Sequence, residues 1–409
     1  MSAAIRQYLV ITGNYWAFTL TDGALRMLVV LHFHQLGYSP LEVAMLFVFY
    51  EFFGVVTNLV GGYLGARLGL NRTMNIGLFL QLVALAMLAV PSQALTIPLV
   101  MAAQALSGIA KDLNKMSAKS GIKLLVPGDQ QGKLYRWVAL LTGSKNTLKG
   151  VGFFLGGGLL VWTGFQGAMI IMGAVLFLVW LASLFLLGQD LGRSKAKPKF
   201  SQILSKSRAI NVLSAARLFL FSARDVWFVV ALPVYLHTVF GWDFWQVGGF
   251  MAIWVIGYGA VQTLAPYFTG KNTGTTPAKG VIAGWAAALA LVPAAIALGL
   301  TQELSPQLVV VGGLLLFGVL FAVNSSLHSY LIVSFARGDG VSLDVGFYYM
   351  SNAAGRLLGT LLSGGVYQLY GLEACLWISA VFVALAALLT LALPAPEQPV
   401  NQAVSSQQG

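Results

Sequence analysis

Long apolar blocks, each about as long as a helix that crosses a bilayer, recur along the whole chain of 409 residues. A transmembrane helix needs about 20 consecutive apolar residues. Only 9% of the residues are charged, against roughly 25% in soluble domains. This pattern excludes a soluble α/β enzyme, a β-barrel and a coiled coil. It predicts an all-α membrane protein with twelve transmembrane helices, at about 12–34, 43–65, 74–93, 97–124, 134–162, 165–187, 209–237, 245–268, 279–300, 307–335, 343–370 and 373–394.

Outside the predicted helices, Lys and Arg lie in the connectors on one side of the membrane. The connectors after odd-numbered helices contain none, whereas fifteen lie in the termini, in the connectors after even-numbered helices and at the helix ends beside those connectors. Because cytoplasmic loops carry an excess of Lys and Arg, we expect both termini in the cytoplasm. The net charge of +11 then reflects orientation in a lipid bilayer and does not indicate nucleic-acid binding.

A basic polar stretch divides the chain into two parts. Residues 188–208 include the run from Arg193 to Lys199 and are predicted to form a cytoplasmic linker. The linker separates an N-terminal half of six helices, residues 1–187, from a C-terminal half of six, residues 209–394. Residues 395–409 are rich in Gln, Ser and Pro, a composition typical of a disordered tail.

The two halves repeat each other in parallel. The pair Gly157-Gly158 and the later Gly164 match Gly364-Gly365 and Gly371 at a constant offset of 207 residues. Asp22 and His34 have the same spacing as Asp225 and His237. Such a repeat resembles the major facilitator superfamily. The resemblance implies the major facilitator fold, with two pseudo-symmetric six-helix halves and a substrate site near the midplane between them.

The segment from Gly62 to Arg72 also resembles a signature of that superfamily, Gly-x-x-x-Asp-Arg-x-Gly-Arg-Lys. Gly62, Arg67 and Gly69 match it, but Ala66 replaces the acid. The resemblance makes Arg67 and Arg72 candidates for a gating loop, without the acidic partner of the family's gating salt bridge.

Charged residues inside the predicted helices are the strongest functional signal. A charge at the centre of a transmembrane helix costs about 2.5–3.5 kcal/mol on insertion scales. Nine basic residues minus four acidic ones leave an excess of five positive charges, which favours a wet cavity that binds an anion. The basic residues are Arg26, Lys111, Lys115, Lys119, Lys145, Lys149, Arg217, Arg224 and Arg356, and the acidic ones are Asp22, Glu51, Asp112 and Asp225.

Spacing and symmetry select the candidate substrate-binding residues, which are Arg26, Lys111, Lys115, Lys145, Lys149, Arg224 and Arg356. Some of them have an alternative role in internal pairs, Arg26 with Asp22, and Lys111 or Lys115 with Asp112 or Glu51. For Lys119 and Arg217, which lie near helix ends, the alternative is a position at the lipid headgroups. The four acids and His328 are candidates for coupling or charge pairing.

Other functional classes fit the sequence less well. A membrane enzyme would need a metal or nucleophile motif, and neither His-Glu-x-x-His nor Gly-x-Ser-x-Gly occurs. A single cysteine, Cys375, excludes an internal disulfide and a site of several thiolates. We therefore expect no metal and no cofactor. A multidrug exporter would favour an acidic cavity, so a transporter of a multivalent anion fits the excess of Lys and Arg best.

Four charged segments are similar to the ArsJ-type organoarsenical efflux permeases: Asn14–His34, Tyr50–Asn58, Lys111–Lys119 and Gly143–Gly150. The resemblance implies arsenate resistance in a bacterial inner membrane. In that family, glyceraldehyde-3-phosphate dehydrogenase makes 1-arseno-3-phosphoglycerate from arsenate, and the permease exports it. A monomer is expected, and the driving force, uniport or antiport with protons or phosphate, stays open. The alternative is an organophosphate or sugar-phosphate antiporter of the same superfamily.

Overall fold

The computed structural model describes residues 3–38, 46–126, 130–188, 191–193, 207–269, 277–302, 305–336 and 340–394. Within these ranges all regular structure is helical. The helices are α1 (Ala3–Gln35), α3 (Val48–Leu68), α4 (Leu70–Leu88), η1 (Ser92–Ala94), α5 (Ile97–Leu125), α6 (Gln131–Leu186), α7 (Arg208–Phe228), α8 (Ala231–Thr238), α9 (Phe244–Thr269), α10 (Lys279–Thr301), α11 (Pro306–Phe335) and α12 (Val341–Leu391).

Two of these helices are long enough to cross a bilayer twice. α6 has 56 residues and breaks at Gly164, and α12 has 51 residues and breaks at Gly371. The backbone φ angles there are +68° and +76°, values that glycine adopts readily and other residues rarely adopt. With α7 and α8 forming one span, the described helices make twelve passes, as predicted. The matching breaks also confirm the 207-residue repeat at the level of the backbone.

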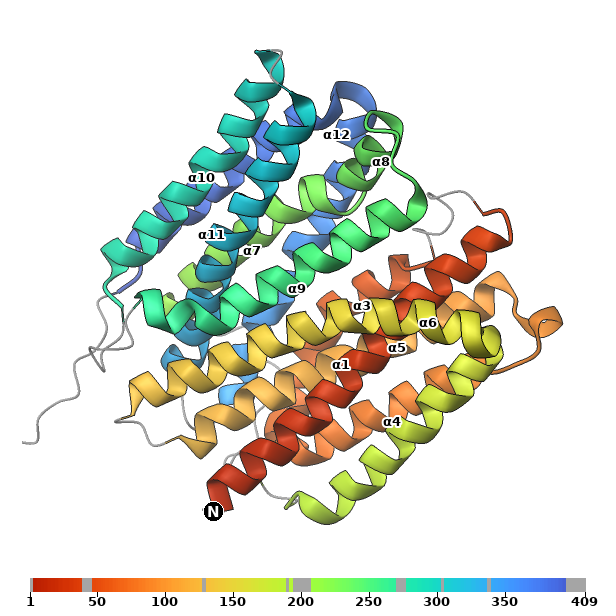
Figure 1. Ribbon diagram of the computed structural model, residues 1–409. Helices are drawn as coiled ribbons and strands as arrows, with labels where there is room; N and C mark the ends of the chain where they lie inside the picture. Colours follow the sequence, from red (N-terminus) through yellow and green to blue (C-terminus); the bar gives the residue numbers. More distant parts are fainter. Residues whose placement is uncertain are drawn as a thin grey trace, which may run out of the picture.

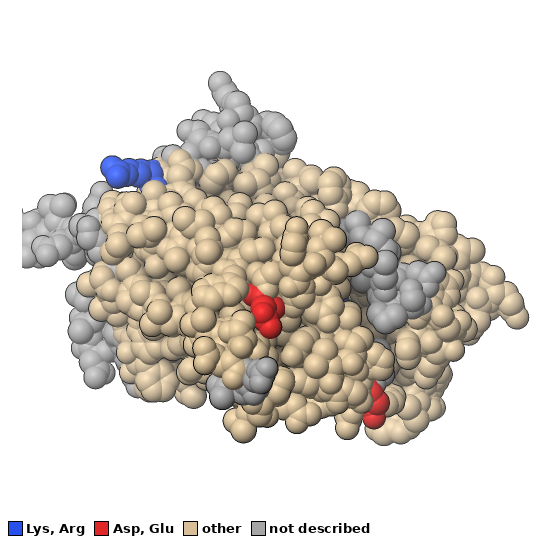
Figure 2. Space-filling view, turned by 90° about the horizontal axis from the view of Figure 1, so that it is seen from above, with Lys and Arg blue, Asp and Glu red and all other residues tan. Residues whose placement is uncertain are grey.

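The outer surface of the bundle is apolar. Seven spans are long and apolar enough to cross a membrane by length and composition alone, and large side chains such as Phe185 and Trp162 are 86% and 80% exposed. Figure 2 shows one face, on which charged side chains are sparse. Such a surface suits lipid, so the chain is a multi-pass membrane protein.

The helices form two bundles, which Figure 1 shows side by side: an N-terminal bundle of α1 to α6 and a C-terminal bundle of α7 to α12. α12 packs on α3, and α9 packs on α6. Between α3 and α12 a Cβ at Gly62 would collide with the carbonyl oxygen of Ser342, so glycine allows the two backbones to touch there. The predicted linker and tail lie mostly outside the described residues.

The bundles meet closely at the end where α1 begins and α12 ends, which we call the terminal end. There Lys123 Nζ of α5 donates to the carbonyl oxygen of Ser334 in α11 at 2.9 Å. Tyr330 Oη of α11 donates to Gln131 Oε1 of α6 at 3.1 Å, and the rings of Tyr330 and Tyr135 stack. These contacts hold the two bundles together at the terminal end.

Candidate functional site

Five charged side chains from four helices form one continuous network, which we call the central charge network. Glu51 Oε1 of α3 lies 2.6 Å from Arg356 Nη2 of α12 and 3.4 Å from Arg26 Nη2 of α1. Asp225 of α7 binds Arg356 Nε at 3.2 Å with Oδ2 and Arg224 Nη2 at 2.5 Å with Oδ1. Residues more than 300 positions apart in the sequence therefore meet, and all five are predicted site residues.

Tyr50 connects this network to a second group of predicted residues. Its hydroxyl donates to Asp22 Oδ1 at 2.8 Å, and Asp22 Oδ2 lies 3.8 Å from Lys149 Nζ. Lys111 Nζ lies 3.7 Å from the centroid of the Tyr50 ring, and Arg26 Cζ lies 5.2 Å from it. Tyr50 was not among the residues expected in the site. In the sequence, a tyrosine next to a charged residue in an apolar segment is only a weak sign of a binding site. Its aromatic ring alone explains why it occurs in a membrane-spanning helix.

Of the internal ion pairs offered as alternatives, the described residues form those in α5 but not the one in α1. Asp112 lies 2.5 Å from Lys115 Nζ and 3.9 Å from Lys111 Nζ, so both lysines share this acid, as the sequence allowed. Arg26 instead contacts Glu51 of α3, and Asp22 contacts Lys149 of α6. The alternative pair of Arg26 with Asp22 within α1 is therefore not formed among the described residues.

Lys145 hydrogen-bonds to a neutral side chain. Its Nζ donates to Asn146 Oδ1 at 3.2 Å, and the Asn146 amide donates to Gln262 Oε1 of α9 at 2.6 Å. No carboxylate oxygen of the described residues lies within the 4.0 Å of an ion pair from Lys145. At this contact between the two bundles, Lys145 therefore has no direct acidic partner among the described residues.

Lys119 and Arg217 lie deep inside the protein, each only 3% exposed. Lys119 donates to Thr142 and Ser329, and Arg217 donates to Asn352 and Ser325. The alternative that they reach the lipid headgroups is therefore wrong. His328 is also buried, and its Nδ1 has no hydrogen-bond partner in the described part of the chain.

The two arginines of the predicted gating loop lie on the surface at the terminal end. Both Arg67 and Arg72 are exposed, and Arg67 donates to the Tyr63 hydroxyl within α3 at 2.6 Å. Gly69, between α3 and α4, has a φ of +97°, which explains the glycine of the signature. Ala66, which replaces the signature acid, is fully buried. The role of these arginines in gating stays a prediction.

Within each ion pair, the basic side chain is more exposed than the acidic one. In every ion pair of the described residues the basic side chain is more exposed than its acid, for example 22% for Arg356 against 0% for Asp225. Asp112 is 2% exposed, whereas Lys111 and Lys115 are 12% and 13% exposed. A ligand that reaches this site would therefore meet ammonium and guanidinium groups before carboxylates.

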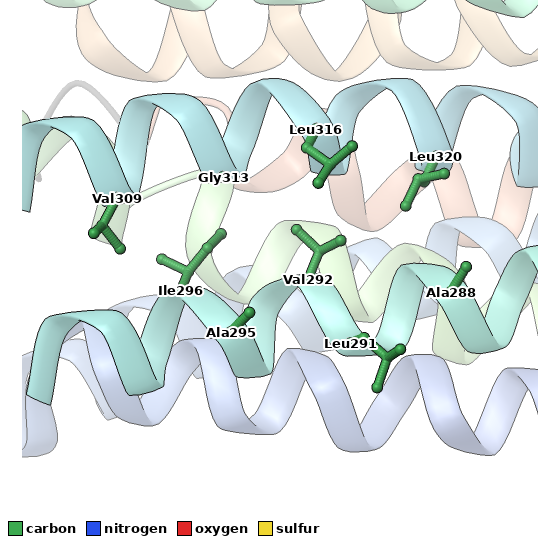
Figure 3. A pocket seen from close by; sticks show the side chains of 9 residues that line it. All are labelled: Ala288, Leu291, Val292, Ala295, Ile296, Val309, Gly313, Leu316 and Leu320. Carbon is green, nitrogen blue, oxygen red and sulfur yellow. The ribbon is translucent and has the colours of Figure 1, made fainter. Parts of the chain in front are cut away.

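An apolar groove of about 430 Å³ lies elsewhere, between α10 and α11 (Figure 3). Its lining is aliphatic, and Leu291 and Leu316 are 72% and 53% exposed. These side chains face outward, where lipid would cover them. The groove has no polar group that could orient a charged ligand, so the candidate site is the charged interior.

Comparisons with known proteins agree with this architecture. The family model described as Major Facilitator Superfamily matches residues 9–343. No curated protein matches the sequence. Among solved structures, the human organic anion transporter MFSD10 (TETRAN) is similar with a TM-score of 0.73 at 16% identity, covering 95% of this chain and 100% of that one.

Two symporters are similar to the same degree. The proton:xylose symporter XylE has a TM-score of 0.74 at 14% identity and covers 96% of each chain. The E. coli fucose:proton symporter FucP has a TM-score of 0.74 at 13% identity, covering 96% of this chain and 100% of that one. At such identities the likeness shows the fold. The family match, the twelve passes and the charged interior together show that this chain is a membrane transporter, not an enzyme, and belongs to the major facilitator superfamily.

Proposed function

We propose that the protein exports an organoarsenical anion, 1-arseno-3-phosphoglycerate, through the charged interior by alternating access, and so confers resistance to arsenate. The observation that carries the proposal is the excess of basic groups in the charged interior, where each basic group that contacts an acid is more exposed than that acid. Buried positive charges without full compensation are costly. A multivalent oxyanion would satisfy them, because Arg and Lys bind phosphate-like groups through charge-assisted hydrogen bonds.

The basic groups come from both bundles, which suits a substrate with an anionic group at each end. The N-terminal bundle supplies Lys111, Lys115, Lys145 and Lys149, and the C-terminal bundle supplies Arg224 and Arg356. Arg26 of α1 contacts Glu51, the acid that also contacts Arg356. In the proposed substrate one end is a phosphate and the other an arsenate ester.

The chemistry of arsenic supports a pentavalent, oxyanionic cargo. Trivalent arsenic prefers soft thiolate ligands and would require several cysteines at one place. The sequence has only Cys375, which is buried in the packed core of the C-terminal bundle. The charged interior offers ammonium and guanidinium donors instead, which match an oxyanion.

The proposal implies a functional link to glyceraldehyde-3-phosphate dehydrogenase, which would supply the cargo in the cytoplasm of a bacterium. Export of an anion from a negative interior gains about 2.3 kcal/mol per charge per 100 mV. This gain would suffice for uniport of a multivalent cargo, and antiport with protons or phosphate stays an open alternative. The same cations would also serve an organophosphate or sugar-phosphate antiporter, which is the alternative function.

The test is growth of an arsenate-sensitive bacterium that expresses this protein, with and without co-expressed glyceraldehyde-3-phosphate dehydrogenase. We expect resistance and low cell arsenic only when both proteins are present. A membrane-inserted protein that gives no resistance in either strain would contradict the arsenical cargo. Exchange of external for internal phosphate or sugar phosphate in proteoliposomes would then establish the antiporter.

A further inference from the structure

Two buried basic side chains lie outside the central charge network and have no acid beside them. Lys119 of α5 and Arg217 of α7 are each 3% exposed. No carboxylate oxygen of the described ranges lies within 4.0 Å of either one. Their hydrogen-bond partners are neutral hydroxyl, amide and carbonyl groups. Buried charges are normally paired or bound to an ion, so this arrangement calls for an explanation.

The two cations approach the same strip of α11. Lys119 Nζ lies 3.5 Å from Ser329 Oγ, and Arg217 Nη1 lies 3.2 Å from Ser325 Oγ. Residues four apart on a helix have Cβ atoms about 5–6 Å apart, so the two serines are neighbours along α11. The ammonium and the guanidinium therefore flank one turn of this helix.

Polar groups without partners surround the same turn. His328 and Tyr348 are 1% and 0% exposed, and neither His328 Nδ1 nor Tyr348 Oη has a hydrogen-bond partner among the described residues. The Tyr348 ring centroid lies 5.3 Å from Arg217 Cζ, and the adjacent Tyr349 ring lies 5.0 Å from Lys119 Nζ. Unsatisfied buried polar groups are rare in native proteins. Here a hydroxyl on a ring that faces Arg217, and an imidazole nitrogen on the residue next to Ser329, have no partner among the described residues.

We propose that Lys119 and Arg217, with Tyr348 and His328 beside them, form a second binding site, for a phosphate-type oxyanion. A tetrahedral oxyanion accepts hydrogen bonds from ammonium, guanidinium and phenol groups at once. The four residues come from α5, α7, α11 and α12, so both bundles contribute to the site.

The site lies between the central charge network and the terminal end. Lys119 follows Lys111 by eight residues along α5, and Arg217 precedes Arg224 by seven along α7. At 1.5 Å per residue both are displaced by about 10–12 Å in the same direction. The inference rests on the proposed function in one respect: the oxyanion is one end of the exported substrate, or else free phosphate moving along the same path.

A chain of hydrogen bonds through neutral side chains links the second site to Lys145, one of the candidate substrate-binding residues. It runs from Lys145 through Asn146 and Gln262 to Ser325, which also accepts from Arg217. Amides and hydroxyls hold the basic groups in place without cancelling their charge. The positive charge at both ends of this chain therefore remains available to an anion.

The test is the thermal stability of the purified full chain with added inorganic phosphate, compared with sodium chloride at equal ionic strength. A ligand that binds the folded state raises Tm according to its concentration and affinity. The parent is the Arg356→Gln variant, which weakens the central charge network; Lys149→Gln replaces it if that variant does not purify. Lys119→Gln and Arg217→Gln are then added separately. Lys123→Gln, on the same helix one turn further on, is the matched control.

We expect phosphate to raise the Tm of the parent and of the Lys123→Gln control equally. Lys119→Gln and Arg217→Gln should each remove most of this shift, and Lys119→Arg should keep it. Without phosphate, Lys119→Gln should melt no lower than the parent, because it removes an uncompensated buried charge. A purely structural lysine would instead lower the phosphate-free Tm and leave the shift unchanged. That result, or the absence of a phosphate shift in the parent itself, would overturn the proposal.

3-Phosphoglycerate distinguishes the two sources of the oxyanion. If the site holds one end of a larger substrate, Arg217→Gln and Arg356→Gln should each weaken binding of 3-phosphoglycerate. If it holds free phosphate, only Arg356→Gln should do so. Either result, with the phosphate shift, supports the second site. Arsenate resistance is measured separately, so its absence would contradict the proposed cargo and leave the second site standing.

Discussion

Glu51 Oε1 and Arg356 Nη2, separated by 2.6 Å, form the ion pair that joins the two bundles among the described residues. Each of the other pairs described there lies within one bundle. The same carboxylate oxygen lies 3.4 Å from Arg26. Glu51 therefore occupies the position between two guanidinium groups, and we expect an anionic substrate bound there to compete with it.

From this competition we expect Glu51→Gln to bind 3-phosphoglycerate about tenfold more tightly, corresponding to about 1.4 kcal/mol. The amide keeps the shape of the side chain but no longer neutralises Arg26 and Arg356. Equilibrium binding to protein in nanodiscs measures the effect, and Glu51→Asp, which keeps the charge, is the control. Unchanged or weaker binding by Glu51→Gln would show that the carboxylate does not compete with the ligand.

Arg356→Gln and Lys149→Gln should each abolish arsenate resistance while the protein still reaches the membrane. Arg356 provides a planar pair of donors that glutamine lacks, and Lys149 is 14% exposed beside Asp22. Arg356→Lys should restore only part of the resistance, because an ammonium cannot make two parallel hydrogen bonds. Resistance is scored by growth in arsenate, with membrane fractions immunoblotted for the protein. Normal growth of both Gln variants would place the site elsewhere.

Asp22→Asn should uncouple export from a pH gradient if protons are the counter-ion. Asp22 accepts from Tyr50 and lies 3.8 Å from Lys149, so its charge bears directly on a substrate-binding lysine. Substrate accumulation in everted vesicles, with and without an imposed gradient, provides the measurement. The same gradient dependence in Asp22→Asn and wild type would exclude this residue from proton coupling.

Gly371→Ala should lower stability by about 1–2 kcal/mol, because an L-residue is strained at the backbone φ of +76° found there. Gly365 is the matched control, since its helical backbone has no positive φ and a Cβ there would meet no atom within 4 Å. Thermal unfolding in detergent compares the two variants. Equal melting temperatures would show that the break in α12 does not require glycine. Gly164→Ala should behave like Gly371→Ala, because the repeat places it in the same conformation.

The fold was largely predictable because membrane insertion depends on local composition. Twelve apolar blocks fix twelve helices whatever their packing, and a 207-residue repeat fixes the correspondence between the halves. The glycines at 164 and 371 mark the breaks because the conformation itself selects glycine. These features are read from neighbouring residues, so the sequence alone reveals them.

The partners of the charged residues were less predictable. The shared acid of Lys111 and Lys115 lies next to them on α5, and this pairing was foreseen as an alternative. Arg26 and Asp22 instead pair across helices, with Glu51 and Lys149. Spacing along one helix cannot indicate which residue of another helix faces it, and so it could not reveal Tyr50 at the centre of these contacts.

The sequence by itself determined the class of this protein: a membrane bundle of twelve passes with more positive than negative charge inside it. Tertiary structure alone decided how that charge is distributed. It turned the basic ends outward from their acids, joined the bundles through Glu51 and Arg356, and buried Lys119 and Arg217 without an acid among the described residues. The physical reason is that hydrophobicity acts residue by residue, whereas a charge is compensated only by the groups that packing brings within a few ångströms of it.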